Sequence, residues 1–175
     1  AGKTTLAEEL NLRLTKNNLS SIVLDGDILR KIFQVGSGKG QYYSRDARID
    51  LGLKYGLLCK TLSNQGFLVI IATISMFDEV YIWNRKNIEN YFEIYLKVPL
   101  SELYSRDNKK IYKRYEDGDL NNVAGLDLLV DEPSLSDVTY DFNLQPVLWE
   151  SPKNLVDSLM EDLNERLSLF QGNFN

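Results

Sequence analysis

The chain opens with residues whose types and spacing suit the binding of a phosphate chain. Gly2, Lys3 and Thr4 match the last three positions of the pattern G-x-x-x-x-G-K-[ST]. In that pattern the glycine lets the backbone approach a phosphate, the lysine reaches the β and γ oxygens, and the hydroxyl ligates Mg²⁺. Thr5 follows in the turn whose backbone N–H groups face the anion. These residues predict a site for a nucleoside triphosphate with Mg²⁺.

A Gly-Lys-Thr tripeptide also occurs by chance, so the residues around it are needed to judge whether it binds phosphate. It opens a helical pattern over residues 4–16, whose apolar side chains share one face: Leu6, Ala7, Leu10 and Leu14. A glycine-capped surface helix that binds nothing is the alternative interpretation. In such loops the first glycine and an apolar strand come earlier, so we expect a segment of roughly ten residues to precede Ala1.

A second group of candidate residues follows a short apolar run over residues 21–25. Asp25 and Asp27 come where this strand ends, and ligands of parallel α/β folds gather at the carboxyl ends of strands. A carboxylate there can hold Mg²⁺ through water or accept the proton of an attacking hydroxyl. An Asx turn with a helix cap at Asp27 is the alternative. Arg30, one turn later, could reach a phosphate of a second substrate.

Cations are concentrated between Arg106 and Arg114. The transition state of phosphoryl transfer spreads negative charge over three oxygens, and positive side chains stabilise it. We expect Arg106 and Lys109 to belong to a lid that closes over the nucleotide. Lys113 and Arg114 fit better as solvated charges on a helix.

The elements that must position these residues alternate along the chain. The expected strands cover residues 21–25, 67–72, 92–98 and 139–144. The expected helices cover residues 4–16, a short stretch around 28–30, then 48–65, 79–90, 99–106 and 109–117, and a last helix that starts at Pro152 after a Ser151 cap. This alternation predicts an α/β fold, a parallel sheet with helices on both faces. With no internal repeat, we expect one domain over residues 1–175.

Composition narrows the classes of function. A net charge of −5 argues against broad nucleic-acid binding. The sequence has no histidine, which excludes a Ser-His-Asp triad and a His-ligated zinc site within these residues. Its one cysteine, Cys59, lies among leucines in a helical pattern and is predicted to be buried filler. With no internal disulfide, signal peptide or apolar run of membrane-spanning length, we expect a cytoplasmic protein with no membrane partner.

Several segments resemble adenylylsulfate kinases in their order and spacing. They are AGKTTLAEEL, LDGDILR, DAR at 46–48, NQGFLVIIATIS, FEIYLKVPL running into YSRDNKKIYKR, and DGDL, AGLD and DEP within 117–133. The resemblance covers nearly the whole chain. It implies a P-loop kinase fold with a lid, and transfer of the ATP γ-phosphate to the ribose 3′-hydroxyl of adenylyl sulfate.

The resemblance also implies roles for individual residues. Lys3, Asp27 and Arg30 would be catalytic, and Mg²⁺ would be held by Thr4 and Asp25. ATP would be bound by Gly2, Lys3, Thr4, Thr5, Arg106 and Lys109. The nucleotide-linked acceptor would meet Asp27, Arg30, Tyr43, Arg48, Ile74, Ser75 and Val123. Whether the protein forms a homodimer is left open.

The departures from the family pattern cluster on the acceptor side. Ile28 and Leu51 replace asparagines of the family pattern, and Leu53 and Asp78 replace arginines. Val123 replaces the phenylalanine that would stack on the acceptor's adenine. Losing one face of a base sandwich costs roughly 1–3 kcal/mol. One branch of the family phosphorylates the 3′-hydroxyl of cytidine diphosphoramidate in capsule modification, and a smaller pyrimidine would suit Tyr43 opposite Val123. Both acceptors stay open, as do a nucleoside monophosphate kinase and a non-catalytic nucleotide-binding regulator.

Overall fold

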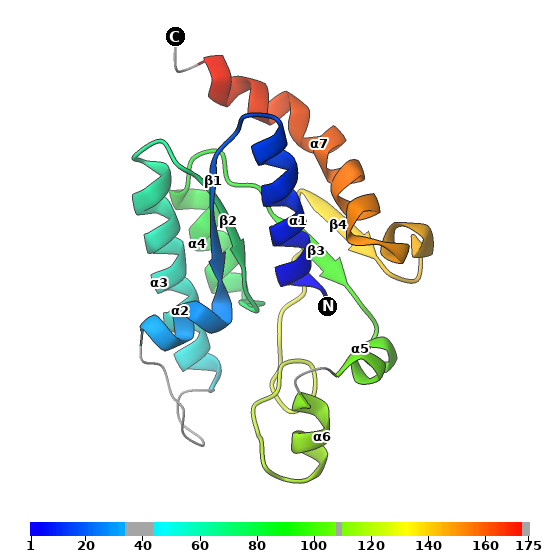
Figure 1. The fold of residues 1–175 in the computed structure, drawn as a ribbon. Helices are drawn as coiled ribbons and strands as arrows, with labels where there is room; N and C mark the ends of the chain where they lie inside the picture. The colour runs from blue at the N-terminus through cyan, green and yellow to red at the C-terminus, as the bar shows by residue number, and fades with distance from the viewer. Residues whose placement is uncertain (34–43, 108–109, 173–175) are drawn as a thin grey trace.

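Four short strands and the helices between them make the fold (Figure 1). The structure is a computed structural model that describes residues 1–33, 44–107 and 110–172, with side chains up to residue 164. The strands are β1 (Ser21–Asp25), β2 (Leu68–Ala72), β3 (Ile94–Lys97) and β4 (Val138–Asp141). All four strands of the sequence prediction are confirmed, with ends shifted by up to three residues.

The strands pair in parallel, as the sequence predicts. β1 pairs with β2, which sets Asp25 opposite Ala72, and β3 pairs with β4, which sets Lys97 opposite Asp141. Within the described residues these are two two-stranded sheets, and no ladder joins β2 to β3. The sequence expects the sheet's central strand before Ala1, outside these residues, so that strand remains a prediction.

The helices follow the predicted order, with a 3-10 segment that the sequence analysis did not expect. They are α1 (Lys3–Lys16), α2 (Gly26–Ile32), α3 (Arg45–Ser63), α4 (Asp78–Asn87), α5 (Leu100–Arg106), α6 (Ile111–Glu116), η2 (Pro146–Glu150) and α7 (Pro152–Gly172). α3 begins three residues earlier than expected, because the Ser44 hydroxyl caps it by accepting from the Ala47 N–H at 3.3 Å. Its first turn therefore includes Arg45.

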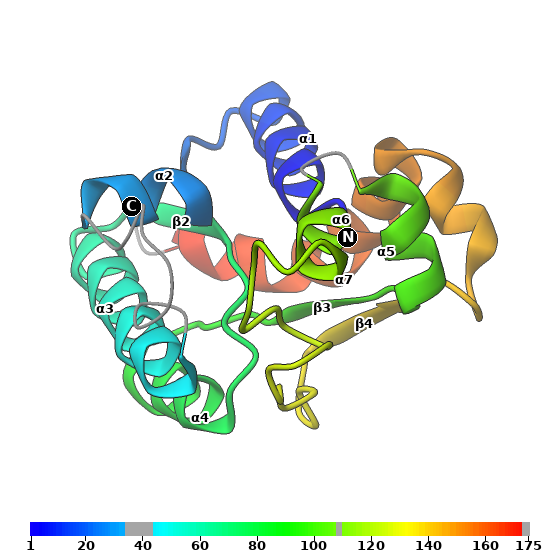
Figure 2. The same ribbon diagram turned by 90° about the horizontal axis from the view of Figure 1, so that it is seen from below.

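Helices cover both sides of the strands, and Figure 2 shows α1 on one side with α4 on the other. Leu10 and Leu14 of α1 pack with Leu159 of α7 and with Leu68 and Ile70 of β2. Successive β2 side chains point to opposite faces, so Ile71 packs instead into a second cluster made by Leu29, Leu51 and Tyr55. This alternation confirms the predicted layer order.

The helices α5 and α6 lie together at the carboxyl end of β3, on the side where α1 begins (Figure 1). The Asp107 carboxylate between them accepts from the backbone N–H groups of Ile111, Tyr112 and Lys113 at 2.8–3.1 Å. The rings of Tyr104 and Tyr112 stack with centroids 4.5 Å apart. These contacts join the two short helices into one unit, the segment that the sequence predicts as a lid.

Two expectations from composition can be compared with the fold. Cys59 is buried, and burial raises the pKa of its thiol to about 11, so it is core filler as predicted. Among the described residues, no helix combines the length and the apolar character that crossing a membrane requires.

Candidate active site

The first turn of α1 presents open backbone N–H groups. Gly2 caps the helix in the left-handed conformation, with φ 79°, and its carbonyl accepts from the Leu6 N–H at 2.9 Å. A glycine adopts this φ without strain, and no side chain occupies the cap position to compete for the first N–H groups. A Cβ placed on Gly2 would meet nothing within 4 Å. Lys3 is half-buried, while Thr4 and Thr5 are exposed, so the turn can receive an anion.

Asp25 joins this turn to the end of β1. Its Oδ2 accepts from the Thr4 hydroxyl at 2.8 Å, while its Oδ1 accepts from the N–H groups of Asp27 and Ile28 at 2.9 and 3.3 Å. The helix cap that the sequence assigned to Asp27 therefore belongs to Asp25, because α2 already starts at Gly26. One carboxylate thus caps a helix with one oxygen and faces the phosphate turn with the other.

The oxygens of Thr4 and Asp25 fit Mg²⁺. This ion prefers oxygen donors, keeps several waters and is usually held by one or two carboxylates together with substrate phosphates. Among the described residues there is no group of three or more Asp, Glu, Cys or His that could enclose a metal. A hydroxyl and a carboxylate beside an open helix N-terminus are the donor set expected for an ion that arrives with a phosphate chain.

The turn that carries Asp27 and Arg30 is packed closely against the end of β2. A Cβ on Gly26 would lie 3.1 Å from the Ala72 carbonyl oxygen, so glycine permits this approach. Tyr55 of α3 lies beneath the turn, with its hydroxyl 3.4 Å from the Gly26 carbonyl oxygen. Burial raises the pKa of Tyr55, with Arg30 opposing the rise and the nearby carboxylates adding to it. The sequence analysis missed Tyr55, although its spacing of four from Leu51 would have placed it on that helix face.

The acceptor candidates Arg48 and Val123 lie close together, because Arg48 bonds to the backbone of the residue before Val123. Arg48 donates to the Asn122 carbonyl at 2.7 Å. The Asp127 carboxylate accepts from the N–H groups of Asn122 and Val123 at 2.7 and 2.6 Å. Val123 is buried, with 8% of its surface exposed. A loop that starts 74 residues after Arg48 is therefore fixed beside the first turns of α3.

Ile74 and Ser75 follow β2 directly. Since Asp25 pairs with Ala72, this segment leaves the sheet next to the Asp25 turn. The Ile74 side chain is 41% exposed, and the Ser75 hydroxyl donates to the Thr73 hydroxyl at 3.3 Å. Tyr43 lies outside the described residues.

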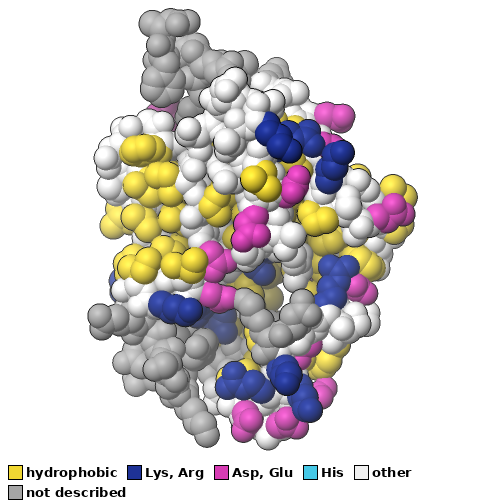
Figure 3. Space-filling view, viewed as in Figure 1, with side chains coloured by type: hydrophobic (Ala, Val, Ile, Leu, Met, Phe, Trp, Pro, Cys, Tyr) yellow, Lys and Arg dark blue, Asp and Glu magenta, His cyan; other side chains and the backbone are white. Residues whose placement is uncertain are grey.

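Arg106 is held at the base of the predicted lid. Its Nε donates to Glu102 at 2.5 Å, and its guanidinium lies over the Phe142 ring, 5.3 Å from the centroid. Phe142 could not be singled out from the sequence, because the predicted strand over residues 139–144 includes it, whereas β4 ends at Asp141. Lys109 lies outside the described residues. Lys113 and Arg114 are exposed, and basic and acidic side chains lie side by side over α6 in Figure 3, which agrees with solvated charges.

At two of the positions that differ from the family pattern, the side chain packs in the core. Leu51 is only 3% exposed and packs with Leu29 and Tyr55, while Leu53 packs against the cluster of Phe77, Val80 and Leu128. Polar side chains at these positions would face a site or lie buried without partners. Here both positions contribute hydrophobic packing instead.

Comparisons with known proteins show which family this chain resembles. The family model described as adenylylsulphate kinase matches residues 1–141. The cytidine diphosphoramidate kinase of Campylobacter jejuni is 42% identical over 134 residues, covering 76% of this chain and 75% of that protein. An adenylyl-sulfate kinase of Pseudomonas aeruginosa is 33% identical over 143 residues, covering 81% and 71%.

A solved structure agrees in fold. The APS kinase of Mycobacterium tuberculosis, in complex with AMPPNP and APS, superimposes with a TM-score of 0.77 at 23% identity, covering 93% of this chain and 91% of that one. At this identity the likeness bears on the fold, which confirms the predicted P-loop α/β class. Together with the family model and the sequence relatives, it shows that the chain belongs to the adenylylsulphate kinase family.

Proposed function

We propose that this chain transfers the γ-phosphate of ATP to the ribose 3′-hydroxyl of cytidine diphosphoramidate. As a member of its family it is a phosphotransferase that uses ATP with Mg²⁺ and acts on a hydroxyl group of a nucleotide-linked molecule. The observation that carries the choice of acceptor is the burial of Leu51, 3% exposed, where the family pattern has an acceptor-binding asparagine.

On the phosphate side, each proposed role follows from position. The N–H groups that follow Gly2 and the Lys3 ammonium bind the β- and γ-phosphates, and Thr5 lies in the same turn. Thr4 and Asp25 hold Mg²⁺, which when bound neutralises charge on the phosphate oxygens. Arg106, at the end of α5, and Phe142, directly after β4, together offer a stacking surface for the base of ATP, with Lys109 as their partner in the lid.

In the reaction, the acceptor hydroxyl oxygen bonds to the γ-phosphorus as the bond from that phosphorus to the β,γ-bridging oxygen breaks. ADP leaves with the bond's electrons, and the hydroxyl proton passes to Asp27 or to water. Asp27 is exposed and sits one residue after Gly26, beside the phosphate turn. Arg30, one turn along α2, balances charge on the acceptor's phosphates. Loose transition states of this kind need orientation more than a strong base.

The acceptor side supports the smaller base. Val123 offers an aliphatic surface where the family pattern has an aromatic ring, and Leu51 offers no hydrogen bond. Arg48, Ile74 and Ser75 remain beside it, with Tyr43 proposed as the one stacking partner. The 42% identity to a cytidine diphosphoramidate kinase agrees with this choice. By this proposal the chain acts in capsule polysaccharide modification.

Adenylyl sulfate is the second candidate, because the matching family model and several relatives carry that activity in their names. With this acceptor, the changes at Leu51 and Val123 would be tolerated drift and the chain would act in sulfate assimilation.

The deciding experiment is phosphate transfer from labelled ATP with Mg²⁺, with the two acceptors at equal concentration. A higher kcat/KM for cytidine diphosphoramidate supports the proposal. A higher kcat/KM for adenylyl sulfate refutes the acceptor choice while keeping the enzyme class. ATP binding without transfer to either would favour a regulator, and transfer to a nucleoside monophosphate would favour the other kinase class.

The domain organisation, the cellular location and the oligomeric state are proposed from the sequence. Residues 1–175 form one P-loop kinase domain that works in the cytoplasm, where ATP is available. A homodimer is a further proposal, and sedimentation velocity would test it.

A further inference from the structure

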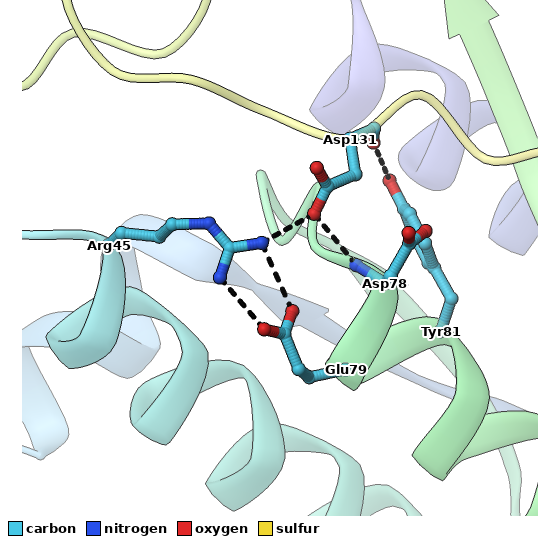
Figure 4. A network of polar contacts seen from close by, with 5 residues as sticks. All are labelled: Arg45, Asp78, Glu79, Tyr81 and Asp131. Atoms are coloured by element: carbon cyan, nitrogen blue, oxygen red, sulfur yellow. Dashed lines mark hydrogen bonds and ion pairs between the residues drawn. The ribbon is translucent and has the colours of Figure 1, made fainter.

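Arg45, in the first turn of α3, contacts two segments that are far from it in the sequence. Its Nη1 donates to Glu79 Oε1 at 2.8 Å and its Nη2 to Glu79 Oε2 at 3.2 Å and to Asp131 Oδ2 at 2.7 Å. Figure 4 shows the guanidinium between these two carboxylates, which come from α4 and from the chain after Val123. The planar fork of arginine suits this double contact, which a lysine could not reproduce.

Asp131 also contacts the segment that follows β2. Its Oδ2 also accepts from the Asp78 N–H at 3.1 Å, its backbone N–H donates to the Met76 carbonyl at 2.9 Å, and its carbonyl accepts from the Tyr81 hydroxyl at 3.3 Å. Ile74 and Ser75 are in this segment. The guanidinium also lies over the Phe77 ring, 5.2 Å from its centroid.

Arg48, one turn further along α3, holds the other end of the same loop at the Asn122 carbonyl. The segment 122–131, which contains Val123, is therefore fixed at both ends by two arginines of one helix turn. Its middle is anchored by Leu128, which is 6% exposed and packs with Phe77 and Val80. Three of the stretches that carry acceptor candidates meet at this network: the start of α3, residues 73–79 and residues 122–131. The fourth, α2 with Asp27 and Arg30, lies outside it.

We infer that Arg45 is a positioning residue for the acceptor site, which sets the distance between Arg48, Ser75 and Val123 by holding Glu79 and Asp131 together. This inference rests on the proposed function, since it assigns these three stretches to the acceptor. Arg45 acts through the segments it joins and not by touching substrate.

Electrostatics gives the direction of the effect. The pKa of Glu79 is lowered, chiefly by its hydrogen bond to Arg45, so this carboxylate is charged when paired. Without the guanidinium, the carboxylates of Glu79 and Asp131 would face each other as like charges, and the Asp131 end of the segment 122–131 would lose its contact with α3. The phosphate side would not follow, because Thr4 and Asp25 lie on α1 and β1 and make none of these contacts.

The test uses Arg45→Gln, with Arg45→Lys and Asp131→Asn as companions and Lys54→Gln as control. Lys54 lies on the same helix and pairs along it with Asp50 at 2.7 Å, and both side chains are exposed. Arg45→Gln should raise the acceptor KM by roughly tenfold, below the ~100-fold that a full 1 Å misplacement can cost, with ATP KM and kcat little changed. Arg45→Lys should lie between wild type and Arg45→Gln. Asp131→Asn should also lie between them, because it weakens the contact without leaving two like charges together. Lys54→Gln should match wild type.

Amide hydrogen exchange provides a readout that does not depend on activity. Residues 122–131 should exchange faster in Arg45→Gln than in wild type or Lys54→Gln, because the Asp131 end loses its contact with α3. Unchanged exchange there would overturn the inference whatever the kinetics show. Faster exchange with an unchanged acceptor KM, or an equal rise in ATP KM, would also overturn it. If wild type phosphorylates neither acceptor, the proposed function fails and the acceptor role of Arg45 fails with it, while the exchange data still decide whether Arg45 fixes the segment.

Discussion

Asp25→Asn should separate the two tasks of one carboxylate. Oδ1 of Asp25 accepts from the N–H groups of Asp27 and Ile28, and Oδ2 faces the Thr4 hydroxyl at 2.8 Å. In the asparagine variant we expect the remaining carbonyl oxygen to stay at the cap, where Oδ1 accepts from both N–H groups in the structure. The amide NH₂ then replaces Oδ2, which turns an acceptor for Mg²⁺ or its water into a donor.

The expected magnitudes differ sharply between stability and activity. Asn caps a helix about as well as Asp, so Asp25→Asn should change the free energy of unfolding by less than about 0.5 kcal/mol. Asp25→Ala removes the cap at a cost of about 1 kcal/mol, which for a chain of this size lowers Tm by about 2–4 °C. Both variants should lose activity by roughly 10- to 100-fold, the usual cost of losing a group that supports a metal.

The assay is thermal unfolding together with the Mg²⁺ dependence of phosphate transfer. Asp141→Asn is the matched control: its Oδ1 accepts from the N–H groups of Asn143 and Leu144 at 2.9 and 3.3 Å, the same geometry at the end of β4. It should leave the Mg²⁺ dependence unchanged. If Asp25→Asn needed no more Mg²⁺ than wild type, Asp25 would be only a cap. If its Tm fell as far as that of Asp25→Ala, the division between the two oxygens would be wrong.

Three further predictions test other parts of the structure. Lys3→Ala should abolish turnover, and Asp27→Asn should lower kcat strongly while ATP still binds, as measured by calorimetry; full activity in the second variant would remove Asp27 from the mechanism. In Gly56→Ala, the new Cβ would lie 2.3 Å from Asn84 Oδ1. Such overpacking costs about 1–3 kcal/mol, while alanine favours the helix over glycine by about 1 kcal/mol. Urea unfolding should therefore show a loss of about 1 kcal/mol in the free energy of unfolding. The pKa of Glu93 is raised, chiefly by burial. Its contribution to stability is therefore complete below the ordinary glutamate pKa and lost as pH rises through the raised value. Glu93→Gln should thus become more stable relative to wild type as pH rises, and parallel pH profiles of the two proteins would contradict this.

The elements of the phosphate side could be predicted because their signals are local. The apolar run that ends at Asp25 gave β1 its observed bounds, and the stripe of Leu6, Leu10 and Leu14 gave α1. The alternative interpretation placed a cap at Asp27, whereas the cap is Asp25, because D-G-D offers two carboxylates within three residues. Only the backbone conformation, extended at Asp25 and helical from Gly26, decides between them.

The side chains that join distant segments could not be predicted. Arg45 reaches Asp131 across 86 positions of sequence, and Tyr55 reaches Gly26 across 29. Such contacts depend on how layers pack, which no short pattern encodes. The placement of Arg106 is different, because Glu102 precedes it by four residues on one helix and this spacing favours an ion pair. That pair was readable from the sequence, and it competes with a role for Arg106 at the phosphates.

This contrast bears on how an acceptor preference can change within one fold. The phosphate turn is made of backbone groups and a few adjacent side chains, Lys3 and Thr4 among them, whose proposed roles do not depend on which acceptor is bound. In the proposed acceptor site, Arg45 and Arg48 hold the two ends of the segment 122–131, so a residue within the segment such as Val123 can change while the segment stays in place. Replacing a stacking ring by Val123 changes base preference by about 1–3 kcal/mol, or roughly 5- to 150-fold. That range is large enough to exchange one nucleotide-linked acceptor for another without altering the transfer step.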